Sequence, residues 1–206
     1  MNYSVVGSAF SKKYGDVIFK ITKDNIFNYS EIEMLKIYNG KCCCKLIYED
    51  KKENFILIEK LIPGDKLCEL NNLNDRIKII CNLIDNLVIP YYKNNEIAFY
   101  DTILEEAFNY CKKEQLYYKY VDTCKNLYNK IKNLNLPLYF LHNDLHSYNI
   151  LKSGNTYKVI DPHGVIGEKI FEYPPFILNG FWCNKQDILY IINEICKYSN
   201  ENKTIS

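Results

Sequence analysis

The distribution of apolar residues predicts a small β-sheet at the start of the chain. Apolar runs from Tyr3 to Phe10 and from Val17 to Ile21 flank a turn-forming segment, residues 13–16, and this pattern predicts a β-hairpin. Two further runs, Cys42 to Tyr48 and Phe55 to Ile62, are separated by a charged turn and predict a second pair of strands. We therefore expect a small antiparallel sheet.

One helix is predicted within this sheet region, and helical patterns fill most of the remaining chain. Residues 28–40 begin with residues that favour helix N-termini, carry apolar positions at helical spacing and end at Gly40. The segment Pro63-Gly64-Asp65 should then break the sheet. Further helices are expected within residues 66–134, at 171–179 and at 185–198, followed by a polar tail at 199–206.

This order of elements predicts an α+β fold with two lobes. We expect a sheet-plus-helix lobe over residues 1–62 and a mainly helical lobe over residues 63–206. A sheet that is joined to a helical body by one segment leaves a cleft at the junction, and ligand sites favour such clefts.

Two polar clusters lie where short apolar segments end, and functional residues often occur at such positions. The first cluster is residues 142–149, and the second begins at Asp161. The spacing His-x-Asp-x-x-x-x-Asn, with a later Asp, is typical of kinase-type phosphotransferases. In these enzymes the loop Asp accepts the proton of the substrate hydroxyl, while the Asn and the second Asp hold Mg²⁺. Asp144, Asn149 and Asp161 fit these three roles.

The same residues leave two other interpretations open. All three histidines of the chain, His142, His146 and His163, lie in this stretch, so a metal-dependent hydrolase using His142, Asp144 and His146 is one alternative. A turn with a purely structural role is the other. A two-metal hydrolase usually needs further ligands elsewhere, and the chain has no other histidine. We therefore prefer the phosphotransferase interpretation.

Lys20 lies in an apolar strand and is costly to bury unless an acidic group pairs with it. In kinases the equivalent lysine contacts the α- and β-phosphates and pairs with a glutamate of the next helix. Glu31 and Glu33 are both candidates, but residues two positions apart on a helix point in different directions, so only one can pair. Further along, backbone groups of residues 59–61 are placed to read an adenine edge, although a plain sheet edge is the alternative.

The composition is that of an ordinary globular protein. The chain has 206 residues, 48% hydrophobic and 25% charged. A net charge of +1 with dispersed lysines gives no reason to expect nucleic-acid or membrane binding. There is no apolar stretch of the roughly twenty residues that a spanning helix needs and no signal-peptide pattern, so we expect a cytoplasmic protein. The nine cysteines contain no Cys-x-x-Cys pair, and we expect reduced, mostly buried thiols.

Taken in order, these segments resemble the aminoglycoside phosphotransferase superfamily. The resemblance runs from about Val17 to Asn179 and includes Lys20, the helix glutamates and residues 142–149. Two runs, Glu59-Lys60-Leu61-Ile62-Pro63-Gly64 and Asp161-Pro162-His163-Gly164-Val165-Ile166-Gly167-Glu168, look most like the streptomycin phosphotransferase and hydroxyurea kinase branch.

The resemblance implies a protein-kinase-like fold and a small-molecule kinase. Its cofactors would be Mg²⁺ and ATP or GTP, and its acceptor would be a hydroxyl of an aminoglycoside-like or other small substrate. The implied site residues are Asp144 as the catalytic group, Asn149 and Asp161 as metal ligands, and Lys20, Glu31, Glu59 and Leu61 as nucleotide contacts. Three carboxylates could line a site for a cationic sugar: Glu168, Glu172 and Asp187. The sequence does not indicate an oligomeric state.

One family feature favours Glu31 over Glu33, because the pairing glutamate of the family is followed four residues later by a leucine, here Leu35. Other features differ from the family. Only about a dozen residues separate Gly7 from Lys20, and they contain no glycine-rich motif. This difference keeps a second hypothesis open, a kinase-like nucleotide-binding module without turnover.

Three further differences lie around and beyond the catalytic segment. The usual glycine before the catalytic aspartate is Asn143 here, and a commonly basic position after Asp-Pro is His163. The family also continues with more helix than this chain carries, so we expect part of the substrate wall to be absent or supplied by another subunit.

Overall fold

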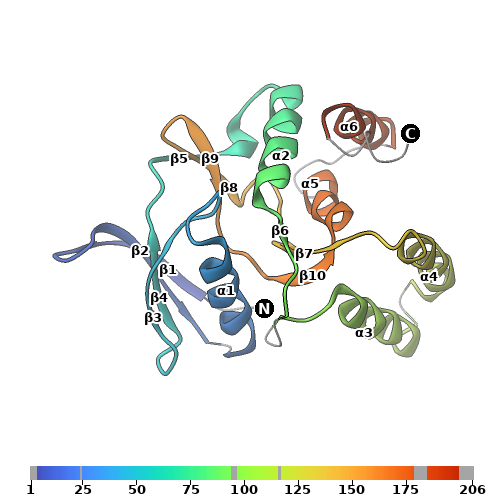
Figure 1. The fold of residues 1–206 in the computed structure, drawn as a ribbon, viewed down its shortest axis with the longest axis horizontal. Coiled ribbons are helices and arrows are strands. Elements are labelled where there is room, and N and C mark those ends of the chain that lie inside the picture. Colours follow the sequence, from blue (N-terminus) through green and yellow to red (C-terminus); the bar gives the residue numbers. More distant parts are fainter. Residues whose placement is uncertain (1–3, 24, 94–96, 116, 179–184, 200–206) are drawn as a thin grey trace.

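The N-terminal part of the protein is a four-stranded antiparallel sheet with one helix beside it (Figure 1). A computed structural model describes residues 4–23, 25–93, 97–115, 117–178 and 185–199. The expected hairpin is formed by β1 (Ser4–Ser11) and β2 (Gly15–Thr22), and the second pair by β3 (Leu46–Asp50) and β4 (Phe55–Glu59). The strand order is β1-β2-β4-β3, so β2 and β4 are the central strands.

The helix of this part, α1 (Asn25–Tyr38), begins slightly earlier than the pattern predicts. It ends as predicted, because Asn39 and Gly40 both take the left-handed conformation, with φ of 47° and 77°. Leu35 and Tyr38 are buried in a hydrophobic core that also contains residues of the helical part. The core is therefore continuous beneath the sheet and the helices.

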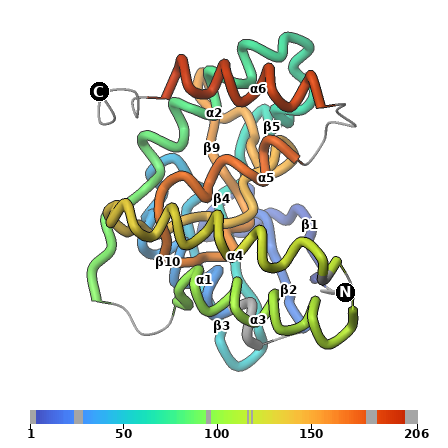
Figure 2. The backbone as a smooth tube through the Cα atoms, turned by 90° about the vertical axis from the view of Figure 1, so that its right-hand side faces the viewer, coloured from blue at the N-terminus to red at the C-terminus, as the bar shows by residue number. Residues whose placement is uncertain are grey.

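The remaining chain is mainly helical and contains two three-stranded sheets (Figures 1 and 2). One sheet has the order β5-β8-β9 and the other β10-β7-β6. The strands are β5 (Pro63–Lys66), β6 (Ile89–Pro90), β7 (Leu138–Leu141), β8 (Ile150–Ser153), β9 (Thr156–Val159) and β10 (Val165–Glu168). The α-helices are α2 (Leu73–Leu87), α3 (Tyr100–Lys113), α4 (Tyr118–Lys132), α5 (Tyr173–Leu178) and α6 (Lys185–Tyr198), with short 3₁₀ segments η1 (Leu67–Glu69) and η2 (Lys169–Glu172).

Several boundaries differ from the sequence-based expectations. Pro63 to Asp65 do end the first sheet, but they begin β5, which pairs with β8. The strand expected from Cys42 begins at Leu46, and the strand expected to reach Ile62 ends at Glu59. The strands β6 and β10 were not predicted, because segments of two and four residues carry no periodicity and are defined by pairing with the distant strand β7. Expected elements at Tyr3, at Asn179 and over 200–206 lie outside the described residues.

The segment before β3 connects the two parts of the fold. The carbonyl of Cys42 accepts the N–H of Val159 at 2.8 Å, and the N–H of Cys44 is donated to the Val159 carbonyl at 2.9 Å. This short parallel bridge attaches the sheet region to the end of β9, which leads directly to Asp161. The eight described cysteines are free thiols, as expected, but only three of them are buried, so the prediction of mostly buried thiols was wrong. None of the described helices has the length and apolarity needed to cross a membrane.

Candidate active site

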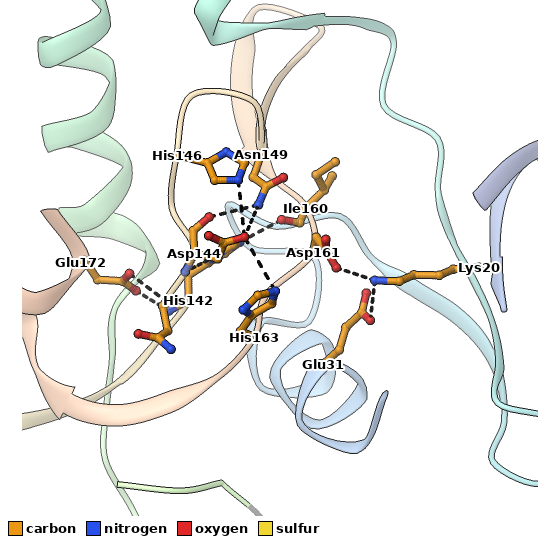
Figure 3. A network of polar contacts seen from close by, with 11 residues as sticks. Lys20, Glu31, His142, Asp144, His146, Asn149, Ile160, Asp161, His163 and Glu172 are labelled. Atoms are coloured by element: carbon orange, nitrogen blue, oxygen red, sulfur yellow. Dashed lines mark hydrogen bonds and ion pairs between the residues drawn. The ribbon is translucent and has the colours of Figure 1, made fainter. Parts of the chain in front are cut away.

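Strand pairing brings the two polar clusters of the sequence together (Figure 3). In the β8–β9 ladder Ile150 is opposite Val159, and the N–H of Ile160 is donated to the Asn149 carbonyl at 3.0 Å. Asn149 and Asp161 therefore lie at the same end of that ladder. In the β7–β10 ladder Leu141 is opposite Val165, so the residues that follow β7 lie beside those that precede β10.

Asp144 and Asn149 form the centre of the site. The Asn149 amide Nδ2 donates to the Asp144 carboxylate Oδ2 at 3.1 Å and to the Asp144 backbone carbonyl at 3.0 Å. The amide oxygen Oδ1 of Asn149 makes no hydrogen bond within the described part of the chain. Asn149 thus orients the Asp144 carboxylate and keeps one oxygen available as a ligand.

Two imidazole rings lie on either side of the Asp144 carboxylate. His146 Nε2 is 3.4 Å and His163 Nε2 is 3.7 Å from Asp144 Oδ2. Partial burial alone would raise the pKa of Asp144, but His146 and then His163 and His142 offset it, and the net pKa is lowered. The hydrogen bond to Asp144 raises the pKa of His146 in turn. Asp144 is therefore an ionised carboxylate at neutral pH.

His142 is a structural residue that fixes the loop. Its Nδ1 accepts the N–H of Asp144 at 3.3 Å, and its Nε2 lies 2.9 Å from the Ile160 carbonyl. Nε2 must therefore carry the proton, and complete burial lowers the pKa of the ring to about 4, so it is neutral. Because backbone groups occupy both nitrogens, His142 cannot ligate a metal. The described residues also contain no group of three or more His, Cys, Asp or Glu side chains arranged to hold a metal ion.

Glu172 supports the same loop from beneath. Its two carboxylate oxygens accept the backbone N–H groups of His142 and Asn143, the latter at 3.2 Å. Burial raises its pKa to about 7, although the two hydrogen bonds act in the opposite direction. Glu172 is 0% exposed and Glu168 is 5% exposed, so neither is a surface carboxylate that could meet a cationic sugar, as their positions in the sequence had suggested.

Lys20 forms the predicted ion pair with Glu31, with 2.8 Å between Nζ and Oε2. Glu33 instead pairs with Lys36, which confirms the choice between the two glutamates. Nζ of Lys20 also contacts the carboxylate of Asp161, so one ammonium on β2 bridges α1 and the segment after β9. Burial would lower the pKa of Lys20, but the two carboxylates outweigh it and raise the pKa, so Lys20 stays charged.

A cleft of about 530 Å³ opens between the sheet and the helical part, and its wall includes Lys20, Glu31 and Asp161. The segment after β4 lines the same cleft. The N–H of Glu59 is donated to the Lys45 carbonyl at 2.8 Å and its carboxylate binds Lys158, so of Glu59 only the carbonyl could face a base. Leu61 makes no backbone hydrogen bond within the described part of the chain, so its N–H and carbonyl are available there.

Backbone conformation explains one departure from the expected motif. Asn143 has φ of 64° and Asp161 has φ of 60°, in the left-handed region that non-glycine residues rarely adopt. Asn is among the residues that tolerate this region best, so Asn143 can replace the usual glycine without changing the loop. The backbone N–H groups of His142 and Asn143 at this turn donate to the Glu172 carboxylate.

Sequence reasoning missed the role of Glu172 and the flanking position of His163. Glu172 is the last residue of the short 3₁₀ segment η2, and its sequence position suggests a solvated glutamate, because its burial depends on the packing of η2 against β7. In the sequence, His163 stands out only as a substitution at a commonly basic position of the family. Only the β7–β10 pairing shows that its ring lies against Asp144.

Comparison with known proteins gives a family and a fold. Residues 13–185 match the family described as aminoglycoside/hydroxyurea antibiotic resistance kinase. No curated protein sequence matches the chain. The structure of choline kinase LicA from Streptococcus pneumoniae is similar with a TM-score of 0.64 at 13% identity, covering 94% of this chain and 70% of that one.

Two further structures share the architecture. A choline/ethanolamine kinase family protein from Mesorhizobium loti gives a TM-score of 0.66 at 11% identity over 90% of this chain and 65% of that chain. The structure of APH(2")-IIa in a ternary complex with streptomycin and ATP gives a TM-score of 0.60 at 14% identity, and the match covers 96% of this chain and 78% of that chain. The two-lobed protein-kinase-like fold predicted from the sequence is thus confirmed.

Proposed function

Because the chain belongs to the aminoglycoside/hydroxyurea antibiotic resistance kinase family, a family of small-molecule kinases, we propose that it transfers the γ-phosphate of ATP or GTP to a hydroxyl group of an aminoglycoside-like or other small substrate. The observation that carries the proposal is that Lys20 and Asp161 line one cleft, and that Asp144 lies beside His163, which lines the same cleft (Figure 3). In this proposal residues 1–62 form the nucleotide-binding lobe and residues 63–206 the catalytic and substrate lobe.

The nucleotide would lie along the cleft with its base near Leu61 and its phosphates near Lys20. Leu61 offers a free backbone N–H and carbonyl, which suit the donor and acceptor pattern of a purine edge. Lys20 is charged and held at the cleft wall by Glu31, so its ammonium is positioned to contact phosphate oxygens.

The residues at the end of the β8–β9 ladder fit a magnesium ion. Mg²⁺ prefers oxygen ligands, and Asn149 offers its free amide oxygen while Asp161 offers a half-exposed carboxylate. The metal would neutralise phosphate charge when bound. The contact between Asp161 and Lys20 holds the carboxylate at the cleft, and the hydrogen bond from Ile160 to Asn149 holds the two ligands side by side.

Asp144 would orient the acceptor hydroxyl and take its proton. The lowered pKa keeps it ionised, and the Asn149 amide fixes the direction of its carboxylate. Phosphoryl transfer needs mostly positioning and charge neutralisation, so a carboxylate of ordinary basicity is sufficient. His142 and Glu172 act through this group, because they fix the backbone on which it stands.

The test is a screen of aminoglycosides and other small hydroxylated compounds for ADP or GDP release, run on the wild type and on Asp144→Asn. We expect release by the wild type with at least one compound and almost none by the variant. Release that is equal in both proteins would contradict the assignment of Asp144.

The second candidate function is a nucleotide-binding module without turnover. It is supported by the β1–β2 connection, which is a short turn at residues 12–14 rather than a glycine-rich loop. Nucleotide binding by calorimetry together with no release for any compound would favour this candidate over the kinase.

A further inference from the structure

The inner face of β2 carries a polar group beyond Lys20 that the proposed function does not use. Alternation along the strand places Ile18, Lys20 and Thr22 on one face, and all three line the cleft. In the β1–β2 hairpin Ser4 is opposite Thr22, and Ser4 lines the cleft as well. A hydroxyl pair therefore lies at one end of the cleft.

The direction of the cleft identifies this end as the phosphate end. Ile18 is opposite Ile58 in the β2–β4 ladder, next to the segment that ends at Leu61, where the base would bind. Lys20 follows two residues later, and Thr22 lies about 7 Å farther along the strand at the usual rise per residue. A triphosphate that passes Lys20 in this direction approaches Thr22.

The hydroxyl pair has hydrogen-bonding capacity to spare. Thr22 is 5% exposed, and its backbone N–H is already donated to the Asn54 carbonyl. The side chains of Ser4 and Thr22 share one hydrogen bond, with 3.3 Å between their oxygens. Two hydroxyls carry two protons, and this bond uses one of them, so among the described residues one O–H donor remains without an acceptor.

The charge at this end makes neutral donors valuable. Lys20 is already in contact with both Glu31 and Asp161, so these three side chains together carry a net negative charge. An incoming polyphosphate adds further negative charge, so it needs hydrogen-bond donors that carry no negative charge themselves. A hydroxyl meets that requirement, and a hydrogen bond to a charged oxygen is stronger than one between neutral groups.

We propose that the hydroxyls of Ser4 and Thr22 form a binding site for the terminal phosphate oxygens of the nucleotide. The inference rests on the proposed nucleotide site and adds to it two residues that discriminate triphosphate from monophosphate. The pair selects by phosphate number, because a nucleoside monophosphate placed with its base at Leu61 ends before Thr22.

The test is calorimetric titration of ATP and ADP with Mg²⁺, and of AMP, into the wild type and the Thr22→Val, Thr22→Ser and Ser4→Ala variants. Guanine nucleotides replace adenine nucleotides if the wild type binds GTP more tightly. Thr22→Val keeps the shape of the side chain, and we expect it to weaken triphosphate binding about tenfold while changing monophosphate binding by less than about twofold. Thr22→Ser restores the hydroxyl and should bind triphosphate as the wild type does, and Ser4→Ala should show the Thr22→Val pattern to a smaller degree.

Ser8→Ala is the matched control, since Ser8 lies on β1, as Ser4 does, but is not among the described residues that line the cleft. It should leave all three affinities unchanged. The inference is overturned if Thr22→Val binds triphosphate like the wild type, or if it weakens monophosphate and triphosphate equally, as loss of packing would. After either of these two outcomes, the proposed function still stands as long as the wild type binds nucleotide. A wild type that binds none of the three nucleotides overturns both.

Discussion

The two walls of the site are held in different ways. The loop that carries Asp144, the proposed proton acceptor, is fixed by hydrogen bonds from its backbone N–H groups to the side chains of His142 and Glu172. In the wall proposed to hold the nucleotide, Lys20 contacts Glu31 from α1 and Asp161 from the chain after β9, and Lys158 of β9 pairs with Glu59 of β4. The first arrangement holds one loop through several backbone hydrogen bonds, whereas the second joins separate elements through ion pairs.

This difference assigns different tasks to the two walls. A group that takes a proton must be oriented before the substrate arrives, and dense backbone support provides that orientation. In the proposed function, Lys20 would contact phosphate and share the Asp161 carboxylate with a metal, so it would exchange partners when the nucleotide binds. Substitutions in the loop should therefore reduce turnover or stability strongly, and substitutions in the bridge should have smaller effects on stability.

Asp144→Asn should have the largest effect, because it removes the proton acceptor but keeps the size of the side chain. We expect turnover on an accepted compound to fall by about a hundredfold to ten-thousandfold, while the nucleotide Kd changes less than about threefold. Steady-state kinetics and calorimetry measure the two quantities. If the nucleotide affinity falls by as large a factor as the turnover, Asp144 acts in nucleotide binding, and the two walls no longer differ in their tasks.

His142 should make the loop sensitive to acid. Its pKa is lowered to about 4 in the fold, so its contribution to stability is complete above its ordinary pKa of 6.5 and is lost as the pH falls towards 4. We expect the wild type to lose up to about 3 kcal/mol more than His142→Gln between pH 7 and pH 4. Urea unfolding at several pH values gives the difference, and equal pH slopes would show that the ring is not buried as neutral imidazole.

Glu172→Gln tests the support beneath the loop. At pH 8 the carboxylate accepts two N–H groups, whereas a glutamine amide presents one oxygen and one donor, so one backbone N–H loses its acceptor. We expect the free energy of unfolding to fall by about 2 kcal/mol. Unchanged thermal and urea stability would mean that water or another group satisfies the loop.

Glu31→Gln should have the smallest effect, because Lys20 keeps its contact with Asp161. We expect a loss of about 1 kcal/mol in the free energy of unfolding. Glu33→Gln, in the same helix but paired with Lys36 on the surface, should change it by less than about 0.5 kcal/mol. If Glu31→Gln lowers the free energy of unfolding as much as Glu172→Gln does, the two walls do not differ in how strongly they support the fold.

The parts of this fold that follow from local pattern could be predicted from the sequence. The hairpin, the helices α2 to α4 and α6, and the rule that only one of Glu31 and Glu33 can pair with Lys20 follow from periodicity, caps and side-chain direction, whereas the choice of Glu31 came from the family resemblance. The short strands β6 and β10 and the buried position of Glu172 could not be predicted, because they depend on pairing or packing against β7, which is distant in the sequence. The sequence names the residues that we propose for the chemistry, but it does not reveal all the groups that support them.

The central claim is that the chain phosphorylates a hydroxyl of a small molecule with Asp144 as the proton acceptor. The most direct measurement is mass spectrometry of each compound that promotes ADP or GDP release, after incubation with Mg²⁺, nucleoside triphosphate and either the wild type or Asp144→Asn. We predict that the compound gains one phosphate on a hydroxyl with the wild type and remains almost unmodified with the variant. Consumption of nucleotide without a phosphorylated compound, or equal phosphorylation by both proteins, would contradict this account.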